Sequence, residues 1–386
     1  MSQKRKVLVI GMADSIHLAR WLKQFVDEDI DFYIFPSKKY RFKNQELKEL
    51  LHSSRIAKYT FITPLNIGLI AGYMDFLKFE LLAKFFHRLK RSNNLAKIIK
   101  YYDFTYIHAI EFQGAGYLLN QVPTLLLNNS KTIVSCLGSD IVYFRRLPHH
   151  ATQIRKSLAV ADYYSAECER DYDLAREFGF IGRTLPCVPA AGGFDLEKYR
   201  SNAISPSQRN QLIIKGNGGT FGRADIPINL LTQIEEEFPN INFFVYSVTK
   251  DMFQLIKTLP PWVKKKIRIS QIRNKISHSQ MIAEFLKSRV YVGCAESDGI
   301  STSYLEAIVT GAYPIQTSTS CASEWTDRGA VSSIIPLDST IALENIREAL
   351  RNNSLVDSAS ETNLEVAQIY LEYNSVKEKA FEFYRI

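Results

Sequence analysis

Residues 290–316, VYVGCAESDGISTSYLEAIVTGAYPIQ, contain the pattern that decides the fold. An apolar strand, Val290–Val292, runs into a loop of small and polar residues. An amphipathic helix follows the loop, and a second apolar strand occupies Tyr313–Gln316. Two strands joined by a helix pair in parallel, because the crossover returns the chain to the edge at which the first strand began. This stretch therefore predicts one repeat of a parallel α/β sheet.

The same alternation recurs in both halves of the chain. It opens with the apolar run Val7–Met12 and a helix over Ile16–Val26, for which Asp14 or Ser15 is the N-cap. The other strands expected are Phe32–Phe35, Thr105–His108, Thr132–Cys136, Tyr163–Ala166, Leu212–Lys215, Asn242–Ser247, Ile267–Ile269 and Ser333–Pro336. Two such series in tandem predict an α/β protein with two Rossmann-like doubly wound domains facing a central cleft.

The length of 386 residues also suits two domains of ordinary size. The segment Ser201–Ser207 is rich in Ser, Asn and Pro, as linkers are, and the domain limit is expected there. The predicted domains are residues 1–203 and 204–362. Residues 363–386 are expected to form one long amphipathic C-terminal helix, and the pattern leaves open whether this helix packs back on the first domain.

Composition and charge exclude several classes of protein. With 46% hydrophobic and 23% charged residues, the chain is expected to fold as a globular protein. The net charge of +8 fits an anionic membrane surface, and it fits an ordinary enzyme equally well; no nucleic-acid partner is expected. The five cysteines lack zinc-ligand spacing, and no run reaches the ~20 apolar residues of a membrane span. A cytoplasmic protein is therefore expected.

Nucleotide-binding patterns narrow the choice further. Neither domain carries G-x-G-x-x-G or a Walker A sequence, so dehydrogenases and P-loop enzymes lose their main support. A different phosphate site is predicted where the helix after Val290–Val292 begins, because the backbone N–H groups at Ser301 to Ser303 point at the same spot. One turn further on, the Glu306 carboxylate can accept hydrogen bonds from both hydroxyls of a ribose, while Asp298 faces the sugar.

Asp298 and Glu306 are two acids separated by seven residues, and Gly311 and Pro314 follow before an apolar strand. In this the chain resembles the retaining GT-B glycosyltransferases that build bacterial polysaccharides and glycolipids (glycosyl transferases group 1). The first acid of that family is usually Glu, and Glu296, two residues too early, is the reserve candidate. The resemblance implies an N-terminal acceptor-binding domain and a C-terminal domain that binds a nucleotide-sugar donor.

The resemblance extends over nearly the whole chain. The donor-binding residues that it implies are Gly11, Lys215, Arg223, Asp298, Gly299, Ile300, Ser301, Thr302, Ser303 and Glu306. The acceptor-binding residues that it implies are Asp14, His17, Glu111 and Asp140. Cys136-Leu-Gly-Ser-Asp140 is similar to the family's His-Gly-Ser-Asp loop, but the usual histidine is missing, which shifts the expected catalytic histidine to His108. Gly192-Gly-Phe-Asp195 resembles the turn that precedes the second domain.

The catalytic set expected from the resemblance is Asp298, His108, Lys215 and Arg223. Lys215 and Arg223 resemble the basic pair that grips the donor diphosphate, and fixed cations lower the barrier where the leaving group gains charge. Because these cations and the helix N-terminus can supply what Mg²⁺ supplies elsewhere, neither a metal nor another cofactor is expected. Front-face displacement, in which the leaving diphosphate accepts the acceptor's proton, requires no protein nucleophile.

Each candidate also has a structural explanation. Glu306 suits the first turn of any helix, and Asp140 could cap a helix. The two cations could be solvated residues at strand ends. His17 and His108 are equally well explained as hydrogen-bonded scaffold groups. The stretch Phe76–Arg91 is predicted to be a basic amphipathic helix, which either rests on an anionic leaflet or packs on its own domain.

We therefore expect a retaining, metal-independent hexosyltransferase. It would transfer a sugar from a nucleoside diphosphate sugar to a glycan or lipid-linked acceptor, in capsule, O-antigen or related surface polysaccharide biosynthesis. It would act in the cytoplasm or peripherally on the inner face of the plasma membrane. Two alternatives are a sugar-nucleotide epimerase or hydrolase of the same fold, which would release sugar without an acceptor, and a non-catalytic sugar-nucleotide-binding protein, which would bind without transfer.

Overall fold

The computed structural model describes residues 4–40, 43–53, 56–62, 91–200, 203–272 and 276–386. The chain forms two compact units, Met1–Gly192 with Lys377–Ile386, and Gly193–Val376. The limit between them lies at the turn Gly192-Gly-Phe-Asp195, earlier in the chain than the 203/204 limit expected from composition. Of the predicted amphipathic segment Phe76–Arg91, all but Arg91 lies outside the described residues.

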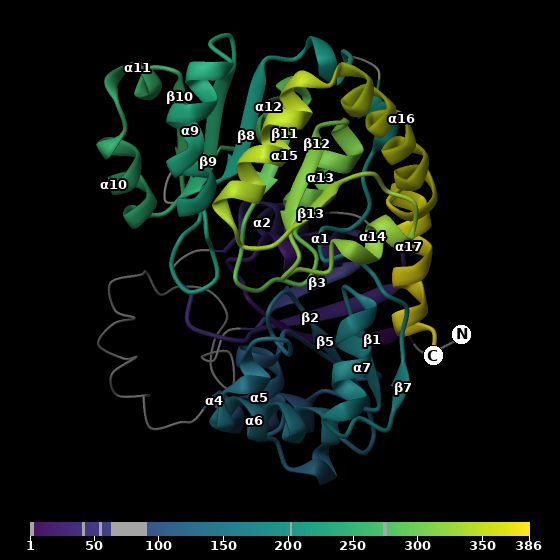
Figure 1. The fold of residues 1–386 in the computed structure, drawn as a ribbon. Coiled ribbons are helices and arrows are strands. Elements are labelled where there is room, and N and C mark those ends of the chain that lie inside the picture. Colours follow the sequence, from purple (N-terminus) through teal and green to yellow (C-terminus); the bar gives the residue numbers. More distant parts are fainter. Residues whose placement is uncertain (1–3, 41–42, 54–55, 63–90, 201–202, 273–275) are drawn as a thin grey trace, which may run out of the picture. The chain divides into compact units, whose positions relative to one another are not determined.

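The first unit contains a seven-stranded parallel sheet in the order β3-β2-β1-β4-β5-β6-β7. Figure 1 draws its strands in purple to teal, the colours of the early chain. Its strands are β1 (Arg5–Gly11), β2 (Ile30–Pro36), β3 (Lys58–Phe61), β4 (Tyr106–Ile110), β5 (Lys131–Cys136), β6 (Tyr163–Ala166) and β7 (Arg183–Thr184). The five inner strands follow the predicted apolar runs. The two edge strands are short and largely exposed, so they carry no such run.

Helices connect these strands. They are α1 (Ile16–Lys23), α2 (Gln45–Leu51), α4 (Arg91–Tyr101), α5 (Tyr117–Leu119), α6 (Pro148–Ala159) and α7 (Glu169–Glu177). Ser15 is the N-cap of α1, because its side chain accepts a hydrogen bond from the backbone N–H of His17. The helix ends at Lys23, one turn before the predicted Val26.

The second unit contains a six-stranded sheet in the order β10-β9-β8-β11-β12-β13. Its strands are β8 (Gln211–Lys215), β9 (Asn242–Val248), β10 (Ile267–Gln271), β11 (Ser288–Gly293), β12 (Tyr313–Thr317) and β13 (Ser333–Ile335), and every pair is parallel. Its helices are α8 (Leu196–Arg200), α9 (Asp225–Glu237), α10 (Lys250–Thr258), α11 (Pro261–Lys264), α12 (His278–Lys287), α13 (Thr302–Thr310), α14 (Ser323–Asp327), α15 (Ser339–Arg351) and α16 (Asn353–Tyr370). Both units are thus Rossmann-like, as predicted.

The end of the chain differs from the single helix expected over residues 363–386. Helix α16 ends at Tyr370, and α17 (Tyr373–Phe381) begins after a break. Glu372 stabilises the start of α17, because its carboxylate accepts hydrogen bonds from the backbone N–H groups of Asn374 and Ser375, at 2.7 and 3.1 Å. Helix α16 lies in the second unit, whereas residues 377–386 pack in the first.

The turn at Gly193 explains why the break is placed where it is. The backbone of Phe194 exchanges hydrogen bonds with Leu371 and Tyr373, which bridges this segment to the residues between α16 and α17. A Cβ atom on Gly193 would overlap the Cα of Tyr373. Glycine is therefore needed for the close approach of the two segments. Among the described residues, no helix is both long and apolar enough to cross a membrane.

Candidate functional site

The candidate site in the second unit lies where strands β8 and β11 end. Helix α13 begins at Thr302, with Ser301 as its N-cap residue, and the Ser301 hydroxyl makes no cap hydrogen bond. Instead it accepts a hydrogen bond from Lys215 Nζ at 3.3 Å. The first-turn N–H groups of a helix carry partial positive charge, so a lysine beside them makes this helix start suitable for an anion.

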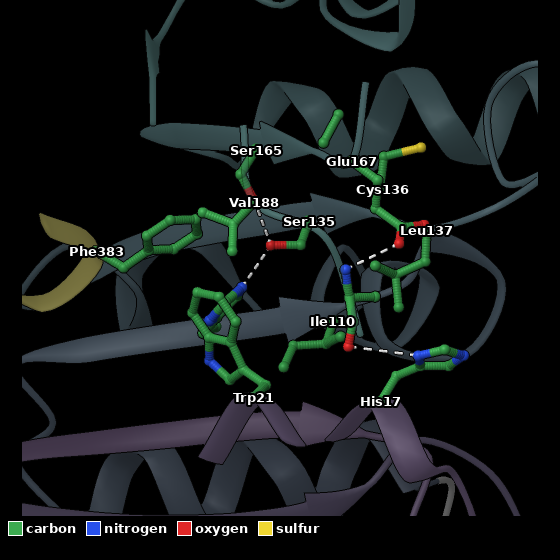
Figure 2. A pocket seen from close by; sticks show the side chains of 13 residues that line it. His17, Trp21, Ile110, Ser135, Cys136, Leu137, Ser165, Glu167, Val188 and Phe383 are labelled. Carbon is green, nitrogen blue, oxygen red and sulfur yellow. Dashed lines mark hydrogen bonds between the residues drawn. The ribbon is translucent and has the colours of Figure 1, made fainter. Parts of the chain in front are cut away.

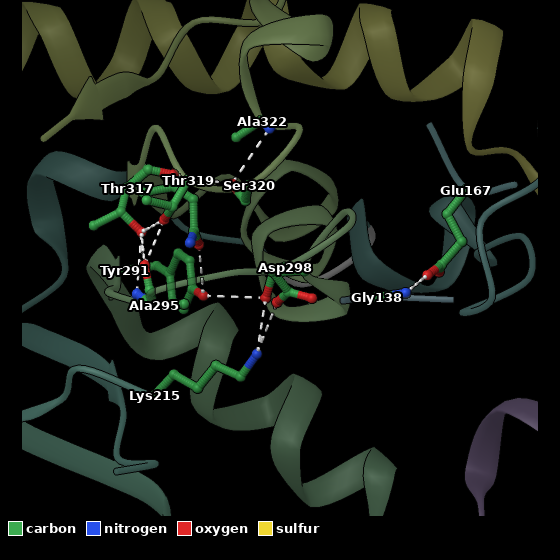
Figure 3. A network of polar contacts seen from close by, with 12 residues as sticks. Gly138, Glu167, Lys215, Tyr291, Ala295, Asp298, Thr317, Thr319, Ser320 and Ala322 are labelled. Atoms are coloured by element: carbon green, nitrogen blue, oxygen red, sulfur yellow. Dashed lines mark hydrogen bonds and ion pairs between the residues drawn. The ribbon is translucent and has the colours of Figure 1, made fainter. Parts of the chain in front are cut away.

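Lys215, the last residue of β8, also pairs with Asp298. Its Nζ lies 3.5 Å from Asp298 Oδ2, and both side chains are partly exposed. Figure 3 draws this ion pair. Asp298 belongs to the loop that joins β11 to α13. The structure therefore brings together three predicted donor-site residues, Lys215, Asp298 and Ser301, from two neighbouring strand ends.

Arg223 engages the other acid of this loop. Its Nη1 lies 2.8 Å from Glu296 Oε1, and its Nε and Nη2 each bind the Asp225 carboxylate at 3.0 Å. The Asp225 and Glu296 carboxylates raise the pKa of the guanidinium above its ordinary value. Glu296, the reserve candidate for the first acid, is thus bound by Arg223, while Asp298 is bound by Lys215.

The backbone holds these two loops together. Arg223 N donates to Cys294 O at 3.0 Å, and Glu296 N donates to Phe221 O at 2.7 Å. The glycine-rich segment 216–222 therefore lies against the start of the β11–α13 loop. A Cβ on Gly222 would overlap the carbonyl of Asn217, so this glycine is required by a tight turn.

Glu306 lies in α13 and is 4% exposed. Its Oε1 accepts a hydrogen bond from His278 Nε2 at 3.0 Å. Burial raises the pKa of the Tyr291 phenol, and the charges of Asp298 and Glu306 raise it further. The charges of Asp298 and Glu306 therefore both act on one buried phenol, that of Tyr291.

The remaining predicted donor residues lie in the β11–α13 loop, in the first turn of α13 and, for Gly11, in the first unit. Ile300 is buried at 4% exposure, and Gly299 accepts a backbone hydrogen bond from Cys321. Thr302 and Ser303 form the first turn of α13, which is the predicted position of the helix start. Gly11 ends β1 in the first unit, where a Cβ would meet the side chain of Leu18 at 3.1 Å.

In the first unit, carboxylates follow three adjacent strands. Glu111 accepts hydrogen bonds from Gly114 N and Ala115 N at 2.8 and 2.9 Å. Asp140 accepts hydrogen bonds from two backbone N–H groups at 2.9 and 3.1 Å, and burial and the Glu111 charge raise its pKa well above its ordinary value. Glu167, after β6, likewise accepts two backbone hydrogen bonds, at 2.8 and 2.9 Å. These contacts favour a loop-ordering role.

Glu111 also has an unusual backbone. Its φ angle is +83°, in a region that residues with side chains rarely adopt. Strain of this kind persists where the surroundings over-determine it and is common at binding sites. Of the other acceptor candidates, Asp14 is exposed, and His17 Nδ1 lies 3.4 Å from the carbonyl oxygen of Ala190.

The predicted catalytic histidine, His108, is buried at 1% exposure. Its Nδ1 lies 2.8 Å from the hydroxyl of Tyr384 and its Nε2 2.6 Å from Ser135 Oγ, so both ring nitrogens have partners. Burial lowers its pKa to about 3. The imidazole lines a cavity of about 30 Å³, room for one or two water molecules, whose wall also includes His17, Trp21 and Glu167 (Figure 2). These contacts favour the scaffold explanation of His108 over the catalytic one.

The buried His108 predicts an acid-sensitive fold. The unfolded chain binds a proton near the ordinary pKa of 6.5, whereas the folded imidazole stays neutral down to about 3. Stability therefore falls as the pH drops below 6.5, by about 2 kcal/mol between pH 7 and pH 5. We expect His108→Gln to reduce the difference in melting temperature between pH 7 and pH 5. An unchanged difference would show that His108 already titrates in the folded protein.

Sequence reasoning missed His278 and Tyr384. Ser277 and Gln280 form a capping box, a pattern that marks the start of α12, but nothing in the sequence indicates that the next imidazole reaches Glu306. The contact between Tyr384 and His108 joins residues 276 positions apart, so no local pattern contains it.

Comparisons with known proteins identify the fold. No family model matches the chain, and no curated protein sequence matches it either. Among solved structures, HepE of Anabaena in complex with UDP and glucose is 14% identical, covers 98% of this chain and 99% of its own, and gives a TM-score of 0.69. Sucrose-phosphate synthase from Thermosynechococcus elongatus is 12% identical, with 99% and 98% covered and a TM-score of 0.71.

A glycosyltransferase from Rickettsia africae is similar as well, at 13% identity, with 99% and 98% covered and a TM-score of 0.63. These likenesses extend over both Rossmann-like units and nearly the full length of each chain. The chain therefore has the GT-B fold. At such low identity the likeness establishes the architecture, and the function has to be argued from the site.

Proposed function

We propose that this protein is a glycosyltransferase that transfers a sugar from a nucleoside diphosphate sugar to a glycan or lipid-linked acceptor. The observation that carries the proposal is the position of Lys215, which lies between the Asp298 carboxylate and the Ser301 hydroxyl at the start of α13. A cation and a helix N-terminus together suit a pyrophosphate, and a neighbouring acid suits sugar hydroxyls. HepE, of the same fold, was solved in complex with UDP-glucose.

In this proposal each residue has one role. The diphosphate binds at the N–H groups of Ser301 to Ser303 and at Lys215. Asp298 accepts hydrogen bonds from the hydroxyls of the transferred sugar, and Glu306 accepts those of the ribose. Arg223 stabilises the charge of the departing diphosphate from the adjacent loop.

The proposed reaction retains the anomeric configuration. The acceptor oxygen attacks the anomeric carbon from the face on which the diphosphate departs, while the bond from that carbon to the phosphate oxygen breaks. The departing diphosphate oxygen takes the acceptor's proton, so no side chain has to serve as nucleophile. Lys215, Arg223 and the start of α13 supply the positive charge, and we propose that the reaction proceeds without a metal.

The biological setting is part of the same proposal. A hexose-type sugar and a glycan or lipid-linked acceptor fit the assembly of a surface polysaccharide such as a capsule or O-antigen. We propose that the reaction takes place in the cytoplasm, or on the inner face of the plasma membrane when the acceptor is lipid-linked.

A thermal-shift screen tests the donor site. UDP, GDP, ADP, TDP and CMP sugars are added to the wild-type protein and to Glu306→Ala and Lys215→Ala. We expect one diphosphate nucleotide to raise the melting temperature of the wild type, because a ligand that binds only the folded state stabilises it. Both variants should lose this rise. If both variants retain the full shift, the residues assigned to the donor site are wrong.

A further inference from the structure

The imidazole of His278 is fixed beside the Glu306 carboxylate, at the start of α12. We infer that His278 is a positioning residue that orients Glu306 toward the ribose of the donor, so that it sets the preference for ribonucleotides over 2′-deoxyribonucleotides. This inference rests on the proposed function, because it assigns the recognition of the nucleoside within the same donor site.

The contact itself is well defined. His278 Nε2 lies 3.0 Å from Glu306 Oε1. An ionised carboxylate has no proton to give, so the imidazole must donate from Nε2. The Glu306 side chain is only 6% exposed, whereas that of His278 is 31% exposed. The histidine therefore reaches a buried acid from a position that solvent, or a ligand, can also reach.

Hydrogen bonds order the backbone on either side of His278. Ser277 and Gln280 form a reciprocal capping box, in which Ser277 Oγ accepts from Gln280 N at 3.3 Å and Gln280 Oε1 accepts from Ser277 N at 2.8 Å. His278 is the first residue of α12, inside this box. The capping box therefore fixes the position of the backbone that carries the imidazole.

A carboxylate needs such a donor in order to be oriented. The terminal torsion of a glutamate side chain has a broad energy profile, so the plane of its two oxygens is poorly fixed by the chain alone. Burial is the main cause of the raised pKa values of the Tyr246 and Tyr291 phenols, and the Glu306 charge raises both values further. These two tyrosines belong to β9 and β11. The His278 bond to Oε1 fixes the plane of the Glu306 carboxylate.

The orientation has a consequence for selectivity. Two vicinal ribose hydroxyls can each donate to one oxygen of an aligned carboxylate. A 2′-deoxyribose removes one hydrogen-bond donor from a buried acid, which costs about 1.5–3 kcal/mol, or about 10- to 150-fold in affinity. A carboxylate that rotates freely fits the pair of hydroxyls less well, so it discriminates less.

The test measures binding of UDP, ADP and GDP, each paired with its 2′-deoxy counterpart, by titration calorimetry. The tightest pair is then compared in the wild type, His278→Phe, His278→Gln, Glu306→Gln and the double variant His278→Phe/Glu306→Gln. We expect the wild type to prefer the ribonucleotide at least 10-fold and His278→Phe to lower this preference below about threefold. His278→Gln keeps an N–H near the same place and should retain most of it.

The double variant shows whether His278 acts through Glu306. The Glu306→Gln variant should show only a small preference for the ribonucleotide over the 2′-deoxyribonucleotide. Adding His278→Phe should not reduce this preference further. A wild-type preference that His278→Phe leaves intact overturns the inference while the proposed function stands. A wild-type protein that binds none of the ribonucleotides overturns both, because the donor site itself is then absent.

Discussion

Replacing Lys215 by methionine is expected to lower kcat/KM for sugar transfer by about 10²- to 10³-fold, the cost of removing one preorganised charge from a developing oxyanion. The Lys215 ammonium lies at hydrogen-bonding distance from Ser301 and in ion-pair contact with Asp298. Negative charge builds up on the diphosphate as the bond to the sugar breaks, so the loss should appear in kcat as well as in KM. Steady-state kinetics with the nucleotide sugar chosen by the thermal-shift screen measures it.

Lys265→Met is the matched control for this variant. Lys265 is exposed and lies in the same unit, between α11 and β10, away from the strand ends that carry the site. The Lys265→Met variant loses the same charge from the same domain. Its kcat/KM should stay within about threefold of the wild type, because long-range effects of exposed charges are screened. Equal losses in both variants would mean that net charge, rather than the position of Lys215, governs turnover.

The fold was largely predictable because the inner strands are buried on both faces. Runs such as Leu212–Lys215 and Thr132–Cys136 are mostly apolar, and the structure confirms them as β8 and β5. The edge strand β3 was not predictable, since two of its four residues are exposed. The break between α16 and α17 depends on the backbone of Phe194, which is far away in sequence.

The candidate site was predictable where it follows from a local pattern. The loop after β11 and the helix start at Thr302 occur as the small residues between a strand and a helix predict. Contacts between distant segments were not predictable. Examples are the pairing of Arg223 with Glu296 and Asp225 and that of His278 with Glu306. These pairings depend on which strands are neighbours in the sheet, and no local sequence pattern indicates the strand order.

The C-terminal Tyr384 is central to the first unit. Its hydroxyl accepts a hydrogen bond from Trp21 Nε1 at 2.9 Å. Since the indole can only donate and neutral His108 can accept at Nδ1, the phenol donates to His108, which in turn donates from Nε2 to Ser135 Oγ. The Tyr384 ring lies 5.0 Å from that of Phe25 and 5.6 Å from that of Phe32.

Tyr384→Ala is expected to destabilise the protein by about 3–5 kcal/mol, the usual cost of deleting a buried aromatic ring. Tyr384 is 0% exposed, so the deletion opens a cavity beside Phe25 and Phe32. It also leaves Trp21 and His108 without their shared partner. Tyr384→Phe keeps the ring and removes only the hydroxyl, for which we expect a loss of about 1–3 kcal/mol. Urea unfolding at pH 7 gives both values.

Tyr384→Ala should cost more free energy of unfolding than Tyr384→Phe, because it removes the ring as well as the hydroxyl. Tyr101→Ala serves as the control, because Tyr101 is 81% exposed in the same unit and its loss should change the free energy of unfolding by less than about 0.5 kcal/mol. A Tyr384→Phe variant as stable as the wild type would mean that water replaces the phenol between Trp21 and His108. A Tyr384→Ala variant within 1 kcal/mol of the wild type would mean that the last residues of the chain are not part of the first unit's core, because the lost burial alone exceeds that value.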